Sequence, residues 1–342
     1  MTQAVIIALA FVGACVGSPV VIAWLGQRGV VDIPNARSSH DVPTPRGVGI
    51  AVALSVGGAG TLAAFTQRGG SQIAIVTMMA TMCAMLGLVE DIRGVTAKWR
   101  LMLQCLLAAS AVAAVFAIPA TIGGWVFVAI ACVGVVAYVN AVNFMDGING
   151  ISASHGIVVG AMWIVQAWGQ HQPGFVGVSA LVIAGCVGFL PWNFPNAKGF
   201  LGDVGSYFLG GWLATAALVG IASHVAVVGV LAPLSLYFLD TGLTIVVRVS
   251  RHESLMTAHR DHVYQRLVRL GWSHARSTAL VAAWTAAISA SAALRSISGF
   301  AIAGSLMALY IAAPALVRLR LDTSTIVALV PLREGEHEER AA

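Results

Sequence analysis

The chain has 342 residues, of which 58% are hydrophobic and only 10% are charged, and its mean hydropathy is +0.86. A soluble domain of this length does not show that balance, so the composition indicates an integral membrane protein. The formal charge of +5 does not indicate a nucleic-acid partner, because no basic stripe is interleaved with stacking aromatic residues.

Apolar segments long enough to cross a bilayer follow one another along nearly the whole chain. We therefore predict an all-α protein, a polytopic membrane helical bundle that forms one domain over residues 1–320, with a disordered cytoplasmic tail at 321–342. Eleven spans are predicted, at residues 3–25, 47–66, 72–89, 101–118, 124–142, 151–168, 176–191, 206–222, 226–247, 277–295 and 299–317.

Short polar clusters separate these spans in pairs, so that all of the clusters emerge at the same face of the membrane. They hold thirteen of the nineteen Lys and Arg residues, and basic residues are retained on the cytoplasmic side, which places the amino terminus outside. Loops that share a face can build one site. The five clusters are Arg28 to Arg46, Glu90 to Arg100, Asn140 to Asn149, Asn193 to Ser206 and Arg248 to Arg276.

The first cluster contains the sequence VDIPNARSSHDVPTPRGVG, in which three prolines impose a non-helical path. Arg37, His40 and Arg46 are spaced along this path and could cover an anionic substrate. Ordinary retention of positive residues explains the arginines equally well, but it gives no reason for so much rigid turn chemistry.

The second cluster reads GLVEDIRGVTAKWR, so that Glu90 and Asp91 end one span, and Lys98 and Arg100 begin the next. Adjacent helical side chains point about 100° apart, so both carboxylates are not expected to bind one ion. One is expected to act and the other to support it. The alternative is an interfacial salt bridge with Arg93.

The third cluster reads VNAVNFMDGING and places Asn140, Asn143, Asp146 and Asn149 at steps of three where a span ends. Neighbouring members can share one helix face until Gly147 loosens the helix. Carboxylate and amide oxygens together suit a hard divalent cation. Simple helix termination explains any one of these residues, but it does not explain four at this spacing.

The fourth cluster, PWNFPNAKGFLGDVGS, places Asp203 between two glycines directly before an apolar run. Asp203 or Ser206 could cap the helix that follows. Flanking glycines also let a backbone approach a phosphate closely, and an acidic residue there can hold Mg²⁺ against it. We favour the metal role, because capping alone does not require both glycines.

The fifth cluster is the longest and carries six arginines and four histidines. His259, Arg260, His262 and Arg266 could grip a diphosphate, since Arg makes bidentate contacts and His supplies a hydrogen bond of adjustable charge. Lone histidines are usually structural. Here two lie three residues apart in a basic loop, which favours ligand binding.

These motifs, taken in order, resemble the polyprenyl-phosphate N-acetylhexosamine-1-phosphate transferases of glycosyltransferase family 4. The resemblance covers about residues 1–320 and rests on PNARSSHDVPTPRG, NFMDGINGIS, WNFPNAKGFLGDVGS and AHRDHVYQRL. These segments most resemble the branch that initiates O-antigen synthesis, whose members often use UDP-linked deoxyhexosamines such as FucNAc or QuiNAc. As a set the motifs are specific, whereas DG or GD alone would be nearly worthless.

The resemblance implies a catalytic role for Asp146 and Asp91, with Glu90 beside them. It also implies that Asn143 and Asp203 bind Mg²⁺, or Mn²⁺ in its place. Glu90 stands where relatives have the first Asp of a pair, which keeps the charge but adds a methylene.

The resemblance further implies that Arg100 contacts phosphate and that His262 belongs to the histidine motif of the last loop. Asn149 stands where many relatives have a second Asp, which argues against a general base and fits hydrogen bonding to uracil or ribose. Asp91 or Asp146 is expected to position the acceptor and not to deprotonate it, and this is favoured over a covalent phosphosugar intermediate on Asp146.

The implied reaction transfers a HexNAc-1-phosphate group from a UDP-sugar to undecaprenyl phosphate in the bacterial inner membrane and releases UMP. The expected partners are UDP-N-acetylhexosamine, undecaprenyl phosphate and membrane lipid, and a homodimer is a candidate assembly. The alternative function is a transporter or lipid flippase. Transport sites tend to place ionisable residues near the bilayer midplane, whereas most here lie at the ends of spans, which favours the enzyme.

Overall fold

The computed structural model describes residues 2–34, 42–168, 170–254 and 259–329, with side chains described up to residue 320. The chain is almost entirely helical there, and a short antiparallel hairpin pairs β1 (Val31–Asp32) with β2 (Thr44–Pro45). The helices are α1 (Gln3–Gln27), α2 (Gly49–Thr66), α3 (Gly70–Arg93), α4 (Ala97–Val115), α5 (Ile122–Met145), α6 (Ile151–Ala167), α7 (Pro173–Asn193), α8 (Gly202–Ala222), α9 (Val227–Leu231), η1 (Ala232–Leu234), α10 (Ser235–Ser250), α11 (Val263–Arg269), α12 (His274–Ala293) and α13 (Ile297–Leu329).

The prediction of a polytopic helical membrane protein is confirmed, and each predicted span coincides with a helical segment. Nine segments in the described part of the chain are long and apolar enough to cross a membrane. The other two are α6, which has only 17 residues, and α12, which is rich in Ala, Ser and Thr. Helix α13 continues to Leu329, beyond the boundary predicted at residue 320, because no Gly or Pro interrupts residues 315–330.

Helix α8 lies at the centre of the bundle, and 94% of the residues in its most apolar stretch of 18 are buried. Glycines allow its neighbours to approach closely: a Cβ on Gly210 would meet the Val139 backbone of α5, and one on Gly87 of α3 would meet the Asp203 backbone of α8. By contrast, α1, α5 and α13 expose large apolar side chains, as helices facing lipid do.

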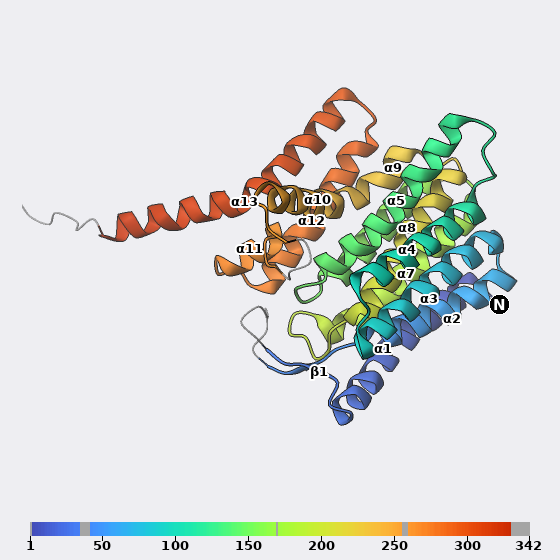
Figure 1. Ribbon diagram of the computed structural model, residues 1–342, viewed down its shortest axis with the longest axis horizontal. Coiled ribbons are helices and arrows are strands. Elements are labelled where there is room, and N and C mark those ends of the chain that lie inside the picture. The colour runs from blue at the N-terminus through green and yellow to red at the C-terminus, as the bar shows by residue number, and fades with distance from the viewer. Residues whose placement is uncertain (1, 35–41, 169, 255–258, 330–342) are drawn as a thin grey trace, which may run out of the picture.

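The ninth predicted span is made of three consecutive pieces, α9, η1 and α10. Pro233 lies in the 3₁₀ turn between the two α-helices, where its ring cannot continue a regular α-helical hydrogen-bond ladder. Figure 1 shows α10 to α13 on one side of the bundle that α1 to α8 form.

The polar clusters gather at one end of the molecule. In Figure 1 the β1–β2 hairpin, the α5–α6 and α7–α8 connections and α11 lie at this end, and the amino terminus lies at the other. The hairpin is joined to the α7–α8 connection, because the backbone N–H of Gly47 donates to the Phe200 carbonyl at 3.2 Å, and that of Phe200 donates to the Pro45 carbonyl at 2.8 Å.

Candidate active site

Asp91 binds the first turn of α8 from the end of α3. Its Oδ1 accepts the backbone N–H of Asp203 at 3.1 Å, and its Oδ2 accepts that of Val204 at 2.9 Å. The first turn of a helix has unsatisfied N–H groups and a positive dipole end, and the residue before α8, Leu201, supplies no side-chain cap. Asp91 therefore caps α8 and fixes the position of Asp203.

Arg46 bridges the two carboxylates from the hairpin. Its Nε lies 3.2 Å from Asp91 Oδ1, and its Nη2 lies 3.0 Å from Asp203 Oδ2. Burial alone would lower the pKa of Arg46, but the carboxylates of Asp203 and Asp91 raise it more, so the net shift of its pKa is upward. The guanidinium thus stays charged where two acidic side chains need a cation.

Asn143 and Asp146 bring the end of α5 to the same place. The Asn143 amide nitrogen donates to Asp203 Oδ1 at 2.8 Å and to Ser206 Oγ at 2.9 Å. Asp146 follows the last residue of α5, and its Oδ1 accepts the Ser152 hydroxyl at 2.6 Å. Burial raises the pKa of the Asp146 carboxyl to about 7, so it is partly protonated at neutral pH.

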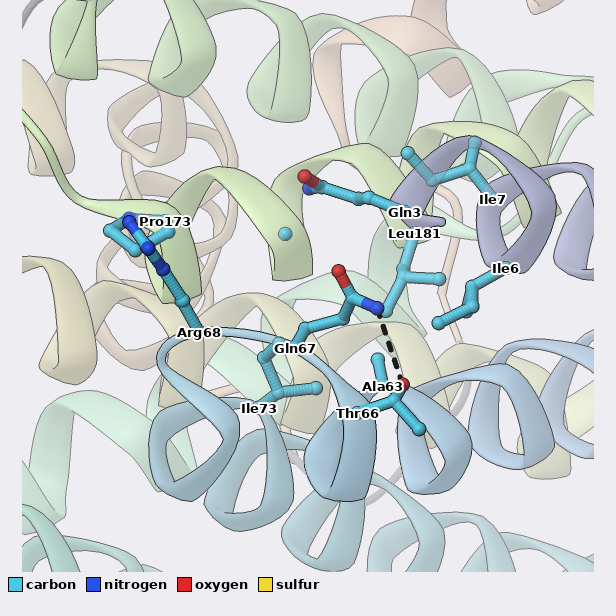
Figure 2. Close-up of a pocket in the computed structure, with 11 residues that line it drawn as sticks. Gln3, Ile6, Ile7, Ala63, Thr66, Gln67, Arg68, Ile73, Pro173 and Leu181 are labelled. Atoms are coloured by element: carbon cyan, nitrogen blue, oxygen red, sulfur yellow. Dashed lines mark hydrogen bonds between the residues drawn. The ribbon is translucent and has the colours of Figure 1, made fainter. Parts of the chain in front are cut away.

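A cavity of about 380 Å³ opens beside this cluster. It is lined by Gly29, Val30, Val31, Asp32, Arg46, Glu90, Asp91 and Asp203. A second cavity, of about 280 Å³, lies near the opposite end, where side chains such as Ile6, Gln67 and Leu181 converge from α1, the α2–α3 connection and α7 (Figure 2). It is lined by none of the predicted site residues, so we assign the chemistry to the first cavity.

Glu90 and Arg100 support the turn between α3 and α4. Glu90 Oε1 pairs with Arg100 Nη1 at 3.2 Å, while Oε2 accepts the Val95 backbone N–H at 3.0 Å. The salt bridge considered for this loop thus exists, with Arg100 in place of Arg93. Glu90 also lines the cavity, whereas Lys98 is exposed on the first turn of α4.

Two asparagines of the third cluster serve other contacts. The Asn140 amide nitrogen donates to Gln104 Oε1 at 2.6 Å and links α5 to α4. The Asn149 amide nitrogen donates to the Pro195 carbonyl at 2.9 Å, and the Asn149 carbonyl accepts the Thr278 hydroxyl at 2.8 Å. Asn149 therefore ties three segments together, and its predicted contact with uracil or ribose stays a prediction.

The last basic loop is folded by a buried arginine. Arg248, whose side chain is 8% exposed, pairs with Asp261 at 2.8 Å and Glu253 at 3.0 Å. His259 and Arg260 are half-buried in this loop, and Arg266 is exposed on α11. Burial, together with the nearby His262 and Arg248, lowers the pKa of His259.

Helix α11 contacts the third cluster through Tyr264, whose hydroxyl donates to the Phe144 carbonyl at 3.0 Å. Next to it, the ring of His262 is buried and directs Nδ1 toward Asp240 at 3.0 Å. Tyr264 of the fifth cluster thus forms a hydrogen bond with Phe144, the residue that follows Asn143 in the third cluster.

Among the predicted site residues, the structure joins four in one contact network: Arg46, Asp91, Asn143 and Asp203. Asp146 lies near enough for the charges of Asp203, Arg46 and Asp91 to act on its carboxyl group, and Glu90 lines the same cavity. Arg37 and His40 lie outside the described residues. Sequence reasoning missed several polar side chains at or near the site: Ser152, Asp240, Arg248 and Tyr264. For Asp240 a signal was present, because a lone acidic residue inside an apolar span is costly unless it has a role.

Comparison with known proteins shows the family of the chain. The model of the family described as "Glycosyl transferase family 4" matches residues 73–247, and relatives match most of the chain. The chain belongs to glycosyl transferase family 4. This confirms the predicted resemblance to the polyprenyl-phosphate N-acetylhexosamine-1-phosphate transferases.

Three relatives illustrate the similarity. A probable undecaprenyl-phosphate N-acetylglucosaminyl 1-phosphate transferase of Bacillus subtilis (strain 168) is 28% identical over 278 residues, which cover 77% of this chain and 76% of the relative. A decaprenyl-phosphate N-acetylglucosaminephosphotransferase of Mycolicibacterium smegmatis is 31% identical over 78% of this chain and 75% of the relative. A phospho-N-acetylmuramoyl-pentapeptide-transferase of Desulforudis audaxviator is 27% identical over 78% of this chain and 90% of the relative. These names do not distinguish the O-antigen branch, which stays a prediction.

Proposed function

We propose that this family 4 protein transfers a HexNAc-1-phosphate group from a UDP-sugar to undecaprenyl phosphate, releases UMP, and thereby initiates a cell-envelope polysaccharide such as O-antigen. The observation that carries the proposal is the bridge of Arg46 between Asp91 and Asp203, beside Asn143 and Asp146, at a 380 Å³ cavity. The names of the relatives support a polyprenyl phosphate acceptor. Family membership also favours a transferase over a transporter or flippase.

The donor set suits Mg²⁺. The Asn143 side chain uses its nitrogen in its hydrogen bonds to Asp203 and Ser206, so its carbonyl oxygen can serve as a ligand. Within the described residues, no three His, Cys, Asp or Glu side chains could hold a metal by themselves. Mg²⁺ commonly binds one or two carboxylates and completes its shell with water and substrate phosphates, so Asp203 and Asn143 fit that mode.

In the proposed reaction an oxygen of the lipid phosphate attacks the phosphorus that carries the sugar. The bond from that phosphorus to the bridging oxygen breaks, and UMP leaves with that oxygen and its electron pair. Both reactants are anions, so their approach must be made electrostatically favourable. A bound Mg²⁺ would supply part of that positive charge. Arg46 contributes a guanidinium that can bind diphosphate oxygens in bidentate fashion.

Asp146 would position the lipid phosphate. A phosphate monoester has its second pKa near 6, so at neutral pH its oxygen is already largely nucleophilic and needs no strong base. Because the pKa of Asp146 is raised to about 7, its protonated form can donate a hydrogen bond to that phosphate, and its ionised form can accept a proton. Direct attack therefore requires no covalent intermediate on this side chain.

The test is release of UMP, and formation of the lipid-linked sugar, by purified protein with undecaprenyl phosphate and a panel of UDP-N-acetylhexosamines. The panel should include the FucNAc and QuiNAc derivatives. Arg46→Ala should lose most of the activity. Arg68→Ala is the matched control, because Arg68 is an exposed arginine at the opposite end of the bundle. If Arg46→Ala keeps the native activity, the proposed site is refuted. If the native protein releases UMP from none of the UDP-sugars in the panel, the proposed reaction is refuted.

We also propose that the site faces the cytoplasm and that the amino terminus is periplasmic. The thirteen-to-two division of basic residues between the loops of the two faces supports this orientation. In a variant that lacks native cysteines, a cysteine at Ala197 should react with an impermeant reagent only after the membrane is opened, whereas one at Arg68 should react in intact cells. Labelling of both positions from one side would contradict the orientation.

A further inference from the structure

Asp240 is an acidic residue buried inside the membrane-spanning segment Val227–Ser250, and it is 1% exposed. Removing a carboxylate from water costs several kcal/mol unless hydrogen bonds and charges compensate. Such a residue inside a span therefore needs a reason. Asp240 lies on α10, which ends immediately before the basic loop.

Every recorded contact of the Asp240 carboxylate is with a group that can donate a hydrogen bond. Oδ1 lies 3.0 Å from His262 Nδ1 and accepts the Val263 backbone N–H at 3.2 Å, which also lies 3.1 Å from Oδ2. Oδ2 accepts the Tyr310 hydroxyl at 2.8 Å, and the Thr244 hydroxyl lies 3.4 Å from Oδ1. All four partners can donate, and the Val263 N–H can only donate, so this environment can give an ionised carboxylate four hydrogen-bond donors.

The carboxylate determines the state of the His262 ring. When Asp240 is ionised it can only accept, so its hydrogen bond with His262 then uses a proton on Nδ1. The other nitrogen, Nε2, is then the one through which His262 can act. Nε2 can then form a hydrogen bond with a phosphate oxygen, as acceptor or as donor according to which of the two carries the proton. The same carboxylate holds the first turn of α11 through Val263.

We propose that Asp240 is a positioning residue for phosphate transfer, which fixes the orientation and the proton of His262, and that Tyr310 of the last span holds Asp240 in place. The inference rests on the proposed function, because it gives the oriented histidine a phosphate group to bind. It connects α10, α11 and α13 to the cluster at the end of α5 through His262, whose ring centroid lies 6.4 Å from that of Phe144.

The first experiment is nitrogen NMR of histidine-labelled protein in detergent or nanodiscs, with His262→Gln to assign the His262 signals. We expect a protonated Nδ1 in the native protein and a changed protonation pattern in Asp240→Asn. This readout does not depend on turnover, so it decides the inference even if the transferase proposal fails. Identical His262 signals in the native protein and Asp240→Asn would overturn it.

The second experiment is a double-mutant cycle on turnover. Asp240→Asn should lower kcat by about 10- to 100-fold, as loss of a group that orients a functional histidine does. Asp240→Glu should recover part of the loss, and Tyr310→Phe should show a smaller effect. If Asp240 acts through His262, the double variant should be no slower than His262→Gln alone, whereas independent effects would multiply.

Thr241→Val is the matched control. Thr241 is the next residue on α10, and its buried hydroxyl has no hydrogen-bond partner among the described residues. Its loss should leave kcat and the His262 signals unchanged, which separates the specific contact from any change in this segment. Should Asp240→Asn fail to fold, Tyr310→Phe removes one hydrogen bond from the same carboxylate. Wild-type kinetics and unchanged signals in Tyr310→Phe would then contradict the inference.

Discussion

Arg46→Ala tests whether the guanidinium occupies the position of a cation in the ligand-free site. Its Nε and Nη2 lie 3.2 and 3.0 Å from Asp91 and Asp203. Without Arg46 the two carboxylates would keep their places, because Asp91 is also held by the α8 backbone at 2.9 and 3.1 Å. The site would then have one positive charge fewer near the proposed ligand Asp203, so a divalent cation should bind it more tightly.

The magnitudes follow from exposure and geometry. The Arg46 side chain is 44% exposed, so solvent screens its ion pairs, and their loss should cost only about 1 kcal/mol of stability. In turnover the arginine would contact a diphosphate, and a hydrogen bond to a charged group is worth about 1.5–3 kcal/mol. Since 1.4 kcal/mol corresponds to a factor of ten, kcat/KM should fall by about 10- to 100-fold.

Loss of Arg46 should therefore strengthen metal binding and weaken turnover, and a general loss of folding would not produce this combination. Mn²⁺ binding, followed by electron paramagnetic resonance without substrate, should be severalfold tighter in Arg46→Ala than in the native protein, while UMP release slows. In both measurements Arg46→Lys should lie between the native protein and Arg46→Ala, because lysine keeps the positive charge but lacks the forked pair of donors of arginine. Weaker Mn²⁺ binding by Arg46→Ala would refute the view that Arg46 stands in for a metal ion.

Three further predictions concern the same cluster. Asp203→Asn should lower turnover by orders of magnitude in correctly folded protein, as should EDTA, and full activity of either sample would defeat the Mg²⁺ assignment. Asp146→Asn should retain slow turnover without a trapped phosphosugar. Because the pKa of Asp146 is raised to about 7, activity that needs its ionised form should rise with pH through that value. In the variant the rise should lie near pH 6, where the lipid phosphate loses its second proton. Gly87→Ala should displace the Asp203 backbone and reduce both thermal stability and activity, whereas Gly134→Ala, where a Cβ meets open space, should change neither.

The sequence predicted the fold well because a membrane span is a composition signal. Each predicted span contains a helical segment, since a backbone in lipid has few ways to satisfy its own hydrogen bonds. The predicted span boundaries differ from the helix ends at the polar end of the molecule. Helix α3 runs to Arg93 and α8 begins at Gly202, so Asp91 and Asp203 lie on helix ends and not in loops. Polar residues lower hydropathy there but do not end a helix.

The site was predictable only as a set of candidates. Local spacing suggested that Asn143 and Asp146 share a place, and they do lie together at the end of α5. No local pattern indicates that Asp91 caps a helix that begins 111 residues later at Gly202, or that Arg46 reaches both carboxylates. Those contacts depend on how α3 packs against α8, which is a long-range property. The position of Asp240 inside an apolar span was visible in the sequence, but its contacts could not be predicted because its partners come from α11 and α13.

One contact joins stability to chemistry in this protein. Asp91 satisfies two N–H groups at the start of α8, the most buried spanning helix among those described, and one of the two oxygens, Oδ1, also pairs with Arg46. Removing the carboxylate would leave those N–H groups without their cap and would also free the end of the helix that carries Asp203. A loss of activity in Asp91→Ala would therefore not identify a catalytic base. Asp203→Asn changes the proposed metal ligand while the cap remains, so it is the variant that separates chemistry from folding.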